Sequence, residues 1–213
     1  MAKRSTGRST HGTARAATAG GQTDAARLLD IALAQAETDG WENLRLRKVA
    51  DAAGITLAEL CRHYRDTDAL ADAWFRRARD AMLAPMPDDF LAQPAAERLG
   101  MLMMRWFDAL APHRRVTAEM IGAKLWPFHP HHYVPAVFHL SRHIQCWRDA
   151  ARLDAGGRRR QIEEIALTAL FLGTLRTWCR DDGDGQADTR AYLTRQLERA
   201  DALAARCFGR SRP

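Results

Sequence analysis

Apolar residues recur at every third or fourth position along nearly the whole chain after residue 23. This is the pattern of a helix with one face in a core. Four such segments open the sequence, and most of them end at glycine or before proline; they are residues 24–40, 46–54, 56–64 and 68–84. Three short helices followed by a longer connecting one predict a compact N-terminal module.

Longer segments with the same period follow and predict a second, larger group of helices. They cover residues 94–112, 113–125, 136–157, 158–181 and 189–208. Proline and histidine are frequent between two of these segments, which predicts a turn-rich break there. No segment has the alternation of β-branched residues that is typical of a strand. The chain is therefore expected to be all-α, with about nine helices.

Length and composition are those of a soluble globular protein. The 213 residues are 46% hydrophobic and 27% charged, which is enough to form one large core or two small ones. Charges interrupt every apolar run before the ~18 residues of a membrane span, so none is expected. The four cysteines lack paired spacing, which favours reduced thiols and a cytoplasmic location over a disulfide framework.

The net charge of +6 is concentrated at the N-terminus. Lys3, Arg4, Arg8 and Arg15 precede the first acidic residue, in a segment rich in Ser, Thr, Gly and Ala. Residues 1–22 are therefore expected to form a disordered basic tail. Such a tail could follow DNA phosphates or only keep the chain in solution, and the sequence leaves both interpretations open.

The segment Gly54-Ile55-Thr56 predicts a helix-turn-helix. Gly54 can adopt a positive φ where one helix ends, Ile55 can fill the angle between the helices, and Thr56 is a good N-cap for the next helix. A short second helix with one buried and one open face suits the major groove of DNA.

The order of residues around this turn is more specific than the turn itself. The pattern G-W-x(4)-L-x-x-V-A-x-x-A-G-I-T-x-A-x-L-x-R-H-Y-x(5)-L, from Gly40 to Leu70, resembles the N-terminal domain of the TetR family of bacterial transcription regulators. The resemblance covers about residues 24–84. It implies a helix-turn-helix DNA-binding domain at 23–67 and a helical ligand-binding and dimerisation domain at 68–210.

By this resemblance, the helix after the turn lies in the major groove, and basic residues of the preceding helix lie near phosphate. Glu59 and Arg62 are the side chains we expect to read base edges. The expected DNA-binding residues are Arg45, Arg47, Lys48, Thr56, Leu57, Ala58, Glu59, Arg62, His63 and Tyr64. The expected target is a palindromic operator, and the expected function is that of a ligand-responsive repressor.

Four residues depart from the family pattern: Arg45, Leu57, Cys61 and Thr67. Cys61 and Thr67 stand where the family usually has a tyrosine and a lysine that contact phosphate. Arg45 replaces a serine or threonine that would cap the second helix. These departures predict fewer phosphate contacts than the family pattern provides.

A second hypothesis comes from the C-terminal half. Its W-x-x-D segment ending at Asp181, followed by an acidic loop and T-R-x-x-L-x-x-x-L from Thr189, is similar to the lipid-binding accessory proteins of ubiquinone biosynthesis. Those proteins share the TetR-like fold. This resemblance implies an isoprenoid-binding accessory protein that has no operator.

Aromatic residues and methionines of the C-terminal half are expected to line a pocket for a small apolar or lipid-like effector. Arg105 and Arg142 could anchor an acidic head group. The expected pocket residues are Met103, Arg105, Trp106, Phe107, Trp126, Phe128, Arg142, Trp147, Phe171 and Trp178. No catalytic motif occurs, so neither an enzyme nor a cofactor is expected.

Two further expectations concern metal and assembly. His139, His143 and Cys146 have helical spacing that could hold zinc, but they flank the apolar stripe, so no metal site is expected. A homodimer is expected through the last two long helices. The faces expected to form it comprise Ala166, Ala169, Leu170, Gly173 and Thr177 on one helix and Leu193, Leu197, Ala200, Leu203 and Ala204 on the other.

Overall fold

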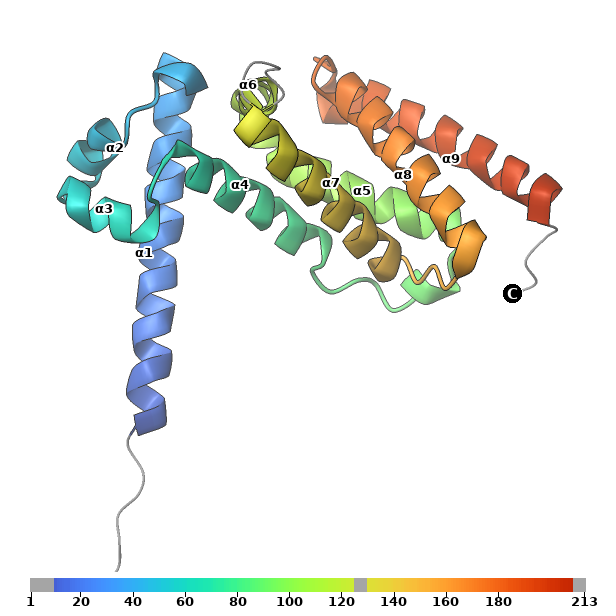
Figure 1. Cartoon of the computed structure of the whole chain (residues 1–213), viewed down its shortest axis with the longest axis horizontal. Coiled ribbons are helices and arrows are strands. Elements are labelled where there is room, and N and C mark those ends of the chain that lie inside the picture. The colour runs from blue at the N-terminus through green and yellow to red at the C-terminus, as the bar shows by residue number, and fades with distance from the viewer. Residues whose placement is uncertain (1–9, 125–129, 209–213) are drawn as a thin grey trace, which may run out of the picture. The chain divides into compact units, whose positions relative to one another are not determined.

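The computed structural model describes the backbone of residues 10–124 and 130–208, and the side chains of residues 24–124 and 140–206. Within these ranges every regular element is a helix, as Figure 1 shows, and the all-α prediction is confirmed. The long elements are α1 (Thr10–Asp39), α2 (Leu46–Ala53), α3 (Leu57–His63), α4 (Thr67–Met82), α5 (Ala95–Leu110), α6 (Arg114–Lys124), α7 (Pro130–Ala150), α8 (Gly157–Trp178) and α9 (Ala187–Phe208). Short 3₁₀ turns occur at Trp41–Asn43, Phe90–Ala92, Ala111–His113 and Asp184–Gln186.

The chain divides into two compact units between Trp74 and Phe75, inside α4. This division lies seven residues after the expected boundary between 67 and 68. A helix that runs through the junction explains the difference, because the hydrophobic pattern of α4 has no break at which the sequence could mark the boundary.

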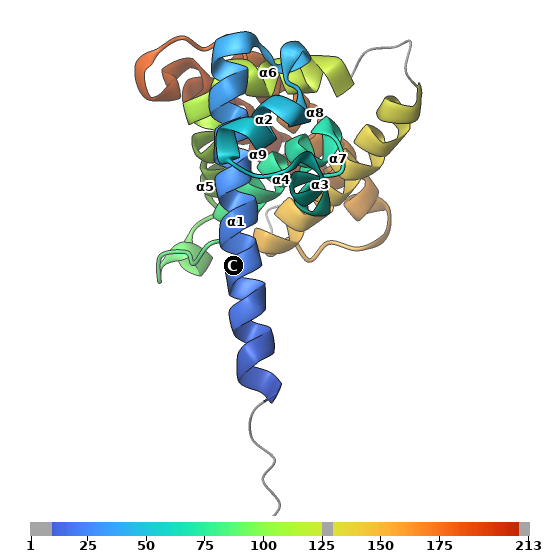
Figure 2. The same cartoon turned by 90° about the vertical axis from the view of Figure 1, so that its left-hand side faces the viewer.

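In the first unit, α2 packs against α1 and α3 packs against α2, as can be followed in Figure 2. The stripe predicted for residues 24–40 supplies much of the core through Leu28, Leu29 and Leu33. Val49 of α2 and Leu60 of α3 are fully buried as well. Burying such a side chain contributes about 1.5–3 kcal/mol, so these few residues hold the short helices in place.

In the second unit, α5 packs against α7 and α9, and α8 packs against both α7 and α9. The largest fully buried side chains of this unit include Phe107, Trp147 and Trp178. The indole N–H of Trp147 donates to the Leu99 carbonyl at 3.0 Å, so this buried polar group is satisfied.

A close contact fixes α8 against α9. Gly173 faces Tyr192, and a Cβ atom at position 173 would overlap the tyrosine hydroxyl. A side chain at position 173 would therefore require the Tyr192 phenol to turn aside from α8.

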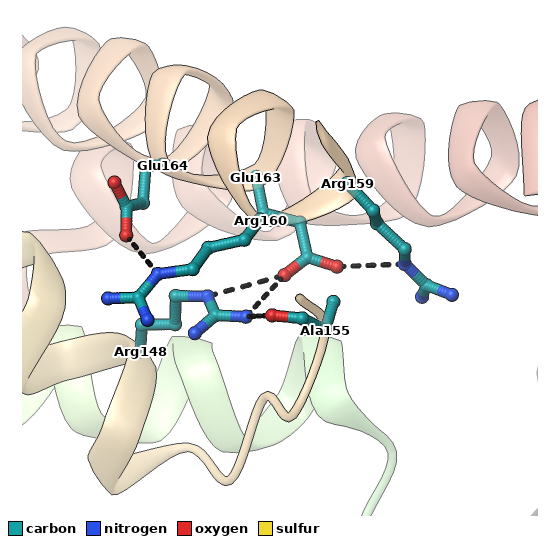
Figure 3. A network of polar contacts seen from close by, with 6 residues as sticks. All are labelled: Arg148, Ala155, Arg159, Arg160, Glu163 and Glu164. Carbon is teal, nitrogen blue, oxygen red and sulfur yellow. Dashed lines mark hydrogen bonds and ion pairs between the residues drawn. The ribbon is translucent and has the colours of Figure 1, made fainter. Parts of the chain in front are cut away.

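The end of α7 is joined to the start of α8 by a buried ion pair, which Figure 3 shows. Arg148 is only 3% exposed, and its Nε and Nη2 lie 3.3 and 3.1 Å from Glu163 Oε2. The same guanidinium donates to the Ala155 carbonyl in the connecting loop. Arg159 binds the other carboxylate oxygen of Glu163 at 3.0 Å. One carboxylate thus holds two arginines and closes the loop.

Two helices begin earlier than the hydrophobic pattern indicates. The helix α1 starts at Thr10, so part of the segment 1–22 that was expected to be disordered is helical. Its several alanines favour helix despite three glycines. The helix α7 starts at Pro130, inside the expected break, where proline fits because the first turn needs no N–H donor from it. Among the described helices, none is long and apolar enough to cross a membrane.

Candidate nucleic-acid interface

The turn between α2 and α3 has the backbone that the sequence predicts. Gly54 adopts the left-handed conformation with φ 69°, which confirms the positive φ expected there. Its N–H donates to the Asp51 carbonyl at 3.2 Å, and the Ile55 N–H donates to the Ala50 carbonyl at 3.1 Å. These bonds satisfy carbonyls that the end of α2 would leave unpaired.

A capping box starts α3. The Thr56 hydroxyl accepts from the Glu59 N–H at 3.2 Å, while the Glu59 carboxylate accepts from the Thr56 N–H and hydroxyl at 2.9 Å each. The hydrogen bonds from the Thr56 backbone and then its side chain lower the pKa of Glu59. The carboxylate therefore caps the N-terminus of its own helix.

The outward face of α3 is well defined. Leu60 is fully buried, whereas Leu57, Ala58, Cys61, Arg62 and His63 are exposed. Leu57 is 44% exposed. Because residues four apart lie on one face, the short helix presents a continuous outer surface.

The end of α3 is held on α1. Tyr64 is only 6% exposed, and its hydroxyl donates to the Ala25 carbonyl at 2.9 Å. The phenol is therefore a brace between two helices.

The basic residues of α2 and the loop before it have local partners. Arg45 donates to the Glu42 and Leu44 carbonyls at 2.8 and 2.9 Å, and no side chain caps α2, as the departure at Arg45 predicts. Lys48 is paired with Asp39 at 2.9 Å. Arg47 lies 3.7 Å from Asp51, and its side chain is mostly exposed. Exposed pairs of this kind contribute only about 0–1 kcal/mol, so they exchange easily for phosphate.

Two polar contacts around the connection from α1 to α2 did not follow from the sequence pattern. Gln35 Nε2 donates to the Lys48 carbonyl at 3.0 Å, and Asn43 Nδ2 donates to the Asp39 carbonyl at 2.8 Å. The pairing in the first contact depends on tertiary packing. The capping box is different, since Thr56 followed three residues later by Glu59 is a signature readable in the sequence.

In the second unit, four of the expected pocket residues form one aromatic cluster. Trp106 lies edge-on to Phe107 and Phe171 with ring centroids 5.1 and 5.3 Å apart, and Phe107 lies 5.4 Å from Trp178. All four are buried, as are Met103 and Trp147.

The two expected anchor residues, Arg105 and Arg142, are not part of this cluster. Arg105 donates to the carbonyls of Ala84 and Pro85 at 2.9 and 3.1 Å, so it closes the loop after α4. Arg142 is exposed. Trp126 and Phe128 lie outside the described residues.

His143 joins the aromatic cluster, which the sequence pattern did not indicate. Its ring lies 4.9 Å from Phe171 and 5.2 Å from Trp106. Burial, with a smaller contribution from the Arg79 guanidinium, lowers the pKa of His143 from 6.5 to about 4. The imidazole is therefore neutral near pH 7. Across the described side chains, no group of three or more potential ligand residues is placed to hold a metal ion.

The motif behind the lipid-binding hypothesis has a structural role. Burial raises the pKa of Asp181, but hydrogen bonds from the Thr189 side chain and backbone outweigh it and leave the pKa below its ordinary value. Asp181 Oδ2 accepts these bonds at 2.6 and 2.8 Å. The Trp178 indole donates to Gln186 at 2.6 Å. The motif thus fixes the turn between α8 and α9, and its residues need no lipid to account for them.

A polar groove of about 470 Å³ lies between α8 and α9. Its lining residues are Gly173, Arg176, Thr177, Arg180, Asp181, Asp188 and Tyr192. None of the expected pocket residues is among them.

Comparison with known proteins identifies similar solved structures. A TetR transcriptional regulator from Nitrosomonas europaea shares 37% sequence identity with this chain, covers 83% of it and 97% of its own length, and superposes with a TM-score of 0.74. A TetR regulator from a Rhodococcus species has the same fold at 16% identity, with a TM-score of 0.61 over 83% of this chain and 95% of its own. No family model and no curated protein matches the chain.

Proposed function

The chain belongs to the TetR family of transcriptional regulators, and on that premise we propose that it binds operator DNA through α2 and α3. The observation that carries the proposal is the exposed outer face of α3, held between the capping box at Thr56 and the Tyr64 brace on α1. Both ends of the helix are fixed, so its side chains meet DNA in one preset arrangement. The regulator would act in the cytoplasm.

The proposed phosphate contacts come from surface arginines and lysines. The side chains of Arg47 and Arg62 are 73% and 70% exposed, and each lies 3.7 Å from its acidic neighbour. Such loose pairs leave the guanidinium groups free to turn to phosphate or a base edge. The basic residues Lys3, Arg4, Arg8 and Arg15 could add to this, but their side chains lie outside the described residues.

We propose further that a small apolar or lipid-like effector is sensed in the second unit, at the cluster around Trp106 and Phe171. Binding there would favour one arrangement of the helices over another and so change the affinity for DNA. Repression is the proposed sign of regulation, released when the effector binds.

A homodimer completes the proposed function, through the two expected helices but with a set of residues that only partly coincides with the predicted faces. Leu170, Leu193 and Leu197 are buried within the subunit, so they are not free for a partner. An exposed stripe instead runs along α8 at Ile162, Ile165, Ala169 and Leu172, continued by Leu203 on α9. Large exposed apolar patches on soluble proteins mark interaction sites, and two-fold dimers are the commonest assembly.

We expect Ile165→Glu to convert the dimer into a monomer. Ile165 is 71% exposed in one subunit, so the change leaves the fold intact but places two carboxylates in the proposed interface. The measurement is the molar mass by light scattering at micromolar concentration. Leu91→Glu is the matched control, because Leu91 is a similarly exposed leucine away from α8. A dimer that survives Ile165→Glu contradicts this interface.

The DNA-binding proposal is tested by selection. Purified chain should enrich a palindromic sequence from a random DNA library, and Arg62→Ala should then weaken binding to that sequence by roughly tenfold or more, the effect of losing one good base contact. Arg195→Ala is the control, since Arg195 is an exposed arginine on α9 in the other unit. Failure to enrich any sequence would refute operator binding.

A further inference from the structure

The outer face of α3 is mostly apolar, although it is the face proposed to meet DNA. Leu57 and Cys61 are four residues apart, as are Ala58 and Arg62, so these four side chains form two adjacent rows. All four are exposed. Three of them present apolar or thiol groups to the outside, and Arg62 is the single cation among the four.

The capping box makes recognition of a base by Glu59 unfavourable. A glutamate on a reading helix would ordinarily accept from the amino group of cytosine. Here Glu59 Oε2 accepts two hydrogen bonds from Thr56, and Oε1 lies 3.7 Å from Arg62. Turning Glu59 toward a base would break the side-chain half of the capping box, namely both of its hydrogen bonds from Thr56. The carboxylate that we expected to read a base edge is thus engaged in the helix itself.

Resting on the proposed function, we propose that Leu57, flanked by Ala58 and Cys61, reads the C5-methyl group of thymine. In the major groove that methyl is the apolar feature of an A·T pair, and apolar side chains recognise it. Leu57 is the first residue of α3, and the N-terminal residues of a recognition helix are the ones that contact base edges. Contact with a methyl group would also bury the leucine, which is 44% exposed in the described chain.

The test removes only the methyl group. The full chain selects its operator from random DNA, and each thymine of a half-site is then replaced in turn by uracil, which pairs identically. We expect the affinity to fall about fourfold when the thymine that Leu57 contacts is replaced by uracil. This is the effect expected from losing one buried methyl group. The Leu57→Ala variant should bind the thymine operator more weakly and show nearly equal affinity for the thymine and uracil forms.

Controls separate this inference from the proposed function. Leu91→Ala removes an equally large exposed side chain and should retain the thymine preference, and circular dichroism verifies that Leu57→Ala is folded. Installing 5-methylcytosine for cytosine at a neighbouring position shows whether the methyl alone is read. If an operator is selected but no uracil substitution weakens wild-type binding, this inference is refuted while operator binding stands. If no operator is selected, the proposed function fails first.

Discussion

Replacing Glu163 by alanine is expected to lower the free energy of unfolding by about 3 kcal/mol, the lower end of the range for breaking a buried ion pair. Arg148 is only 3% exposed, and without Glu163 its charge would stay buried with the Ala155 carbonyl as its remaining acceptor. Glu163 is also paired with Arg159 one turn earlier on α8, so the substitution removes that exposed pair as well as the contact between α7 and α8.

The neighbouring residue gives a matched control. Glu164 lies on the same helix and is paired with Arg160 at 2.8 Å, but this pair is solvent-exposed and spans one turn (Figure 3). Glu164→Ala should therefore cost only about 0.3–0.5 kcal/mol. Urea unfolding of both variants measures the difference. Equal losses would show that Arg148 is stabilised by something other than Glu163. The double variant Arg148→Met with Glu163→Leu should recover most of the loss, because no charge stays buried.

His143 is expected to make the protein less stable in mild acid. Its folded-state pKa of about 4 lies below the ordinary 6.5, so between these values the unfolded chain binds a proton that the folded chain does not. The free energy of unfolding therefore falls as the pH drops from 6.5 to about 4. Above pH 6.5 His143 is neutral in both states, so it adds no pH dependence there. A shift of this size corresponds to about 3 kcal/mol, at 1.36 kcal/mol for each pKa unit.

Comparison of variants isolates this contribution from the carboxyl groups that titrate in the same range. His143→Phe keeps a ring between Trp106 and Phe171 but cannot bind a proton. The wild-type loss of stability between pH 6.5 and 4, followed by chemical unfolding at each pH, should exceed that of the variant by about 3 kcal/mol. Parallel curves for wild type and His143→Phe would show that the buried imidazole is not the cause.

Local signals in the sequence were sufficient to predict the helix-turn-helix. Glycine at 54 predicts a positive φ from its lack of a side chain alone, without knowledge of the tertiary structure. The observed φ of 69° confirms that prediction. The helical period likewise predicted α2 and α3 to within a residue at each end. Such features are set by residues within one or two turns of each other, and for this reason a single sequence reveals them.

Features that depend on distant packing did not follow from the sequence. Nothing near Arg148 or Glu163 in the chain indicates that they meet, because their contact depends on how α7 packs on α8. The same holds for His143, whose neighbours Trp106 and Phe171 come from two other helices. The apolar stripe of α9 shows a related limit: periodicity indicates which face is apolar, but not that Leu193 and Leu197 are buried within the subunit while Leu203 is exposed.

The contact between Gly173 and Tyr192 limits how the second unit can move. A slide of α9 along α8 by one turn, about 5.4 Å, would carry the tyrosine hydroxyl toward Ala169 or Thr177, and both of these residues have the Cβ atom that Gly173 lacks. A slide of one turn in either direction would thus require the Tyr192 side chain to turn aside. We therefore expect the rearrangement that transmits the presence of an effector to take place mainly among the other helices of the unit.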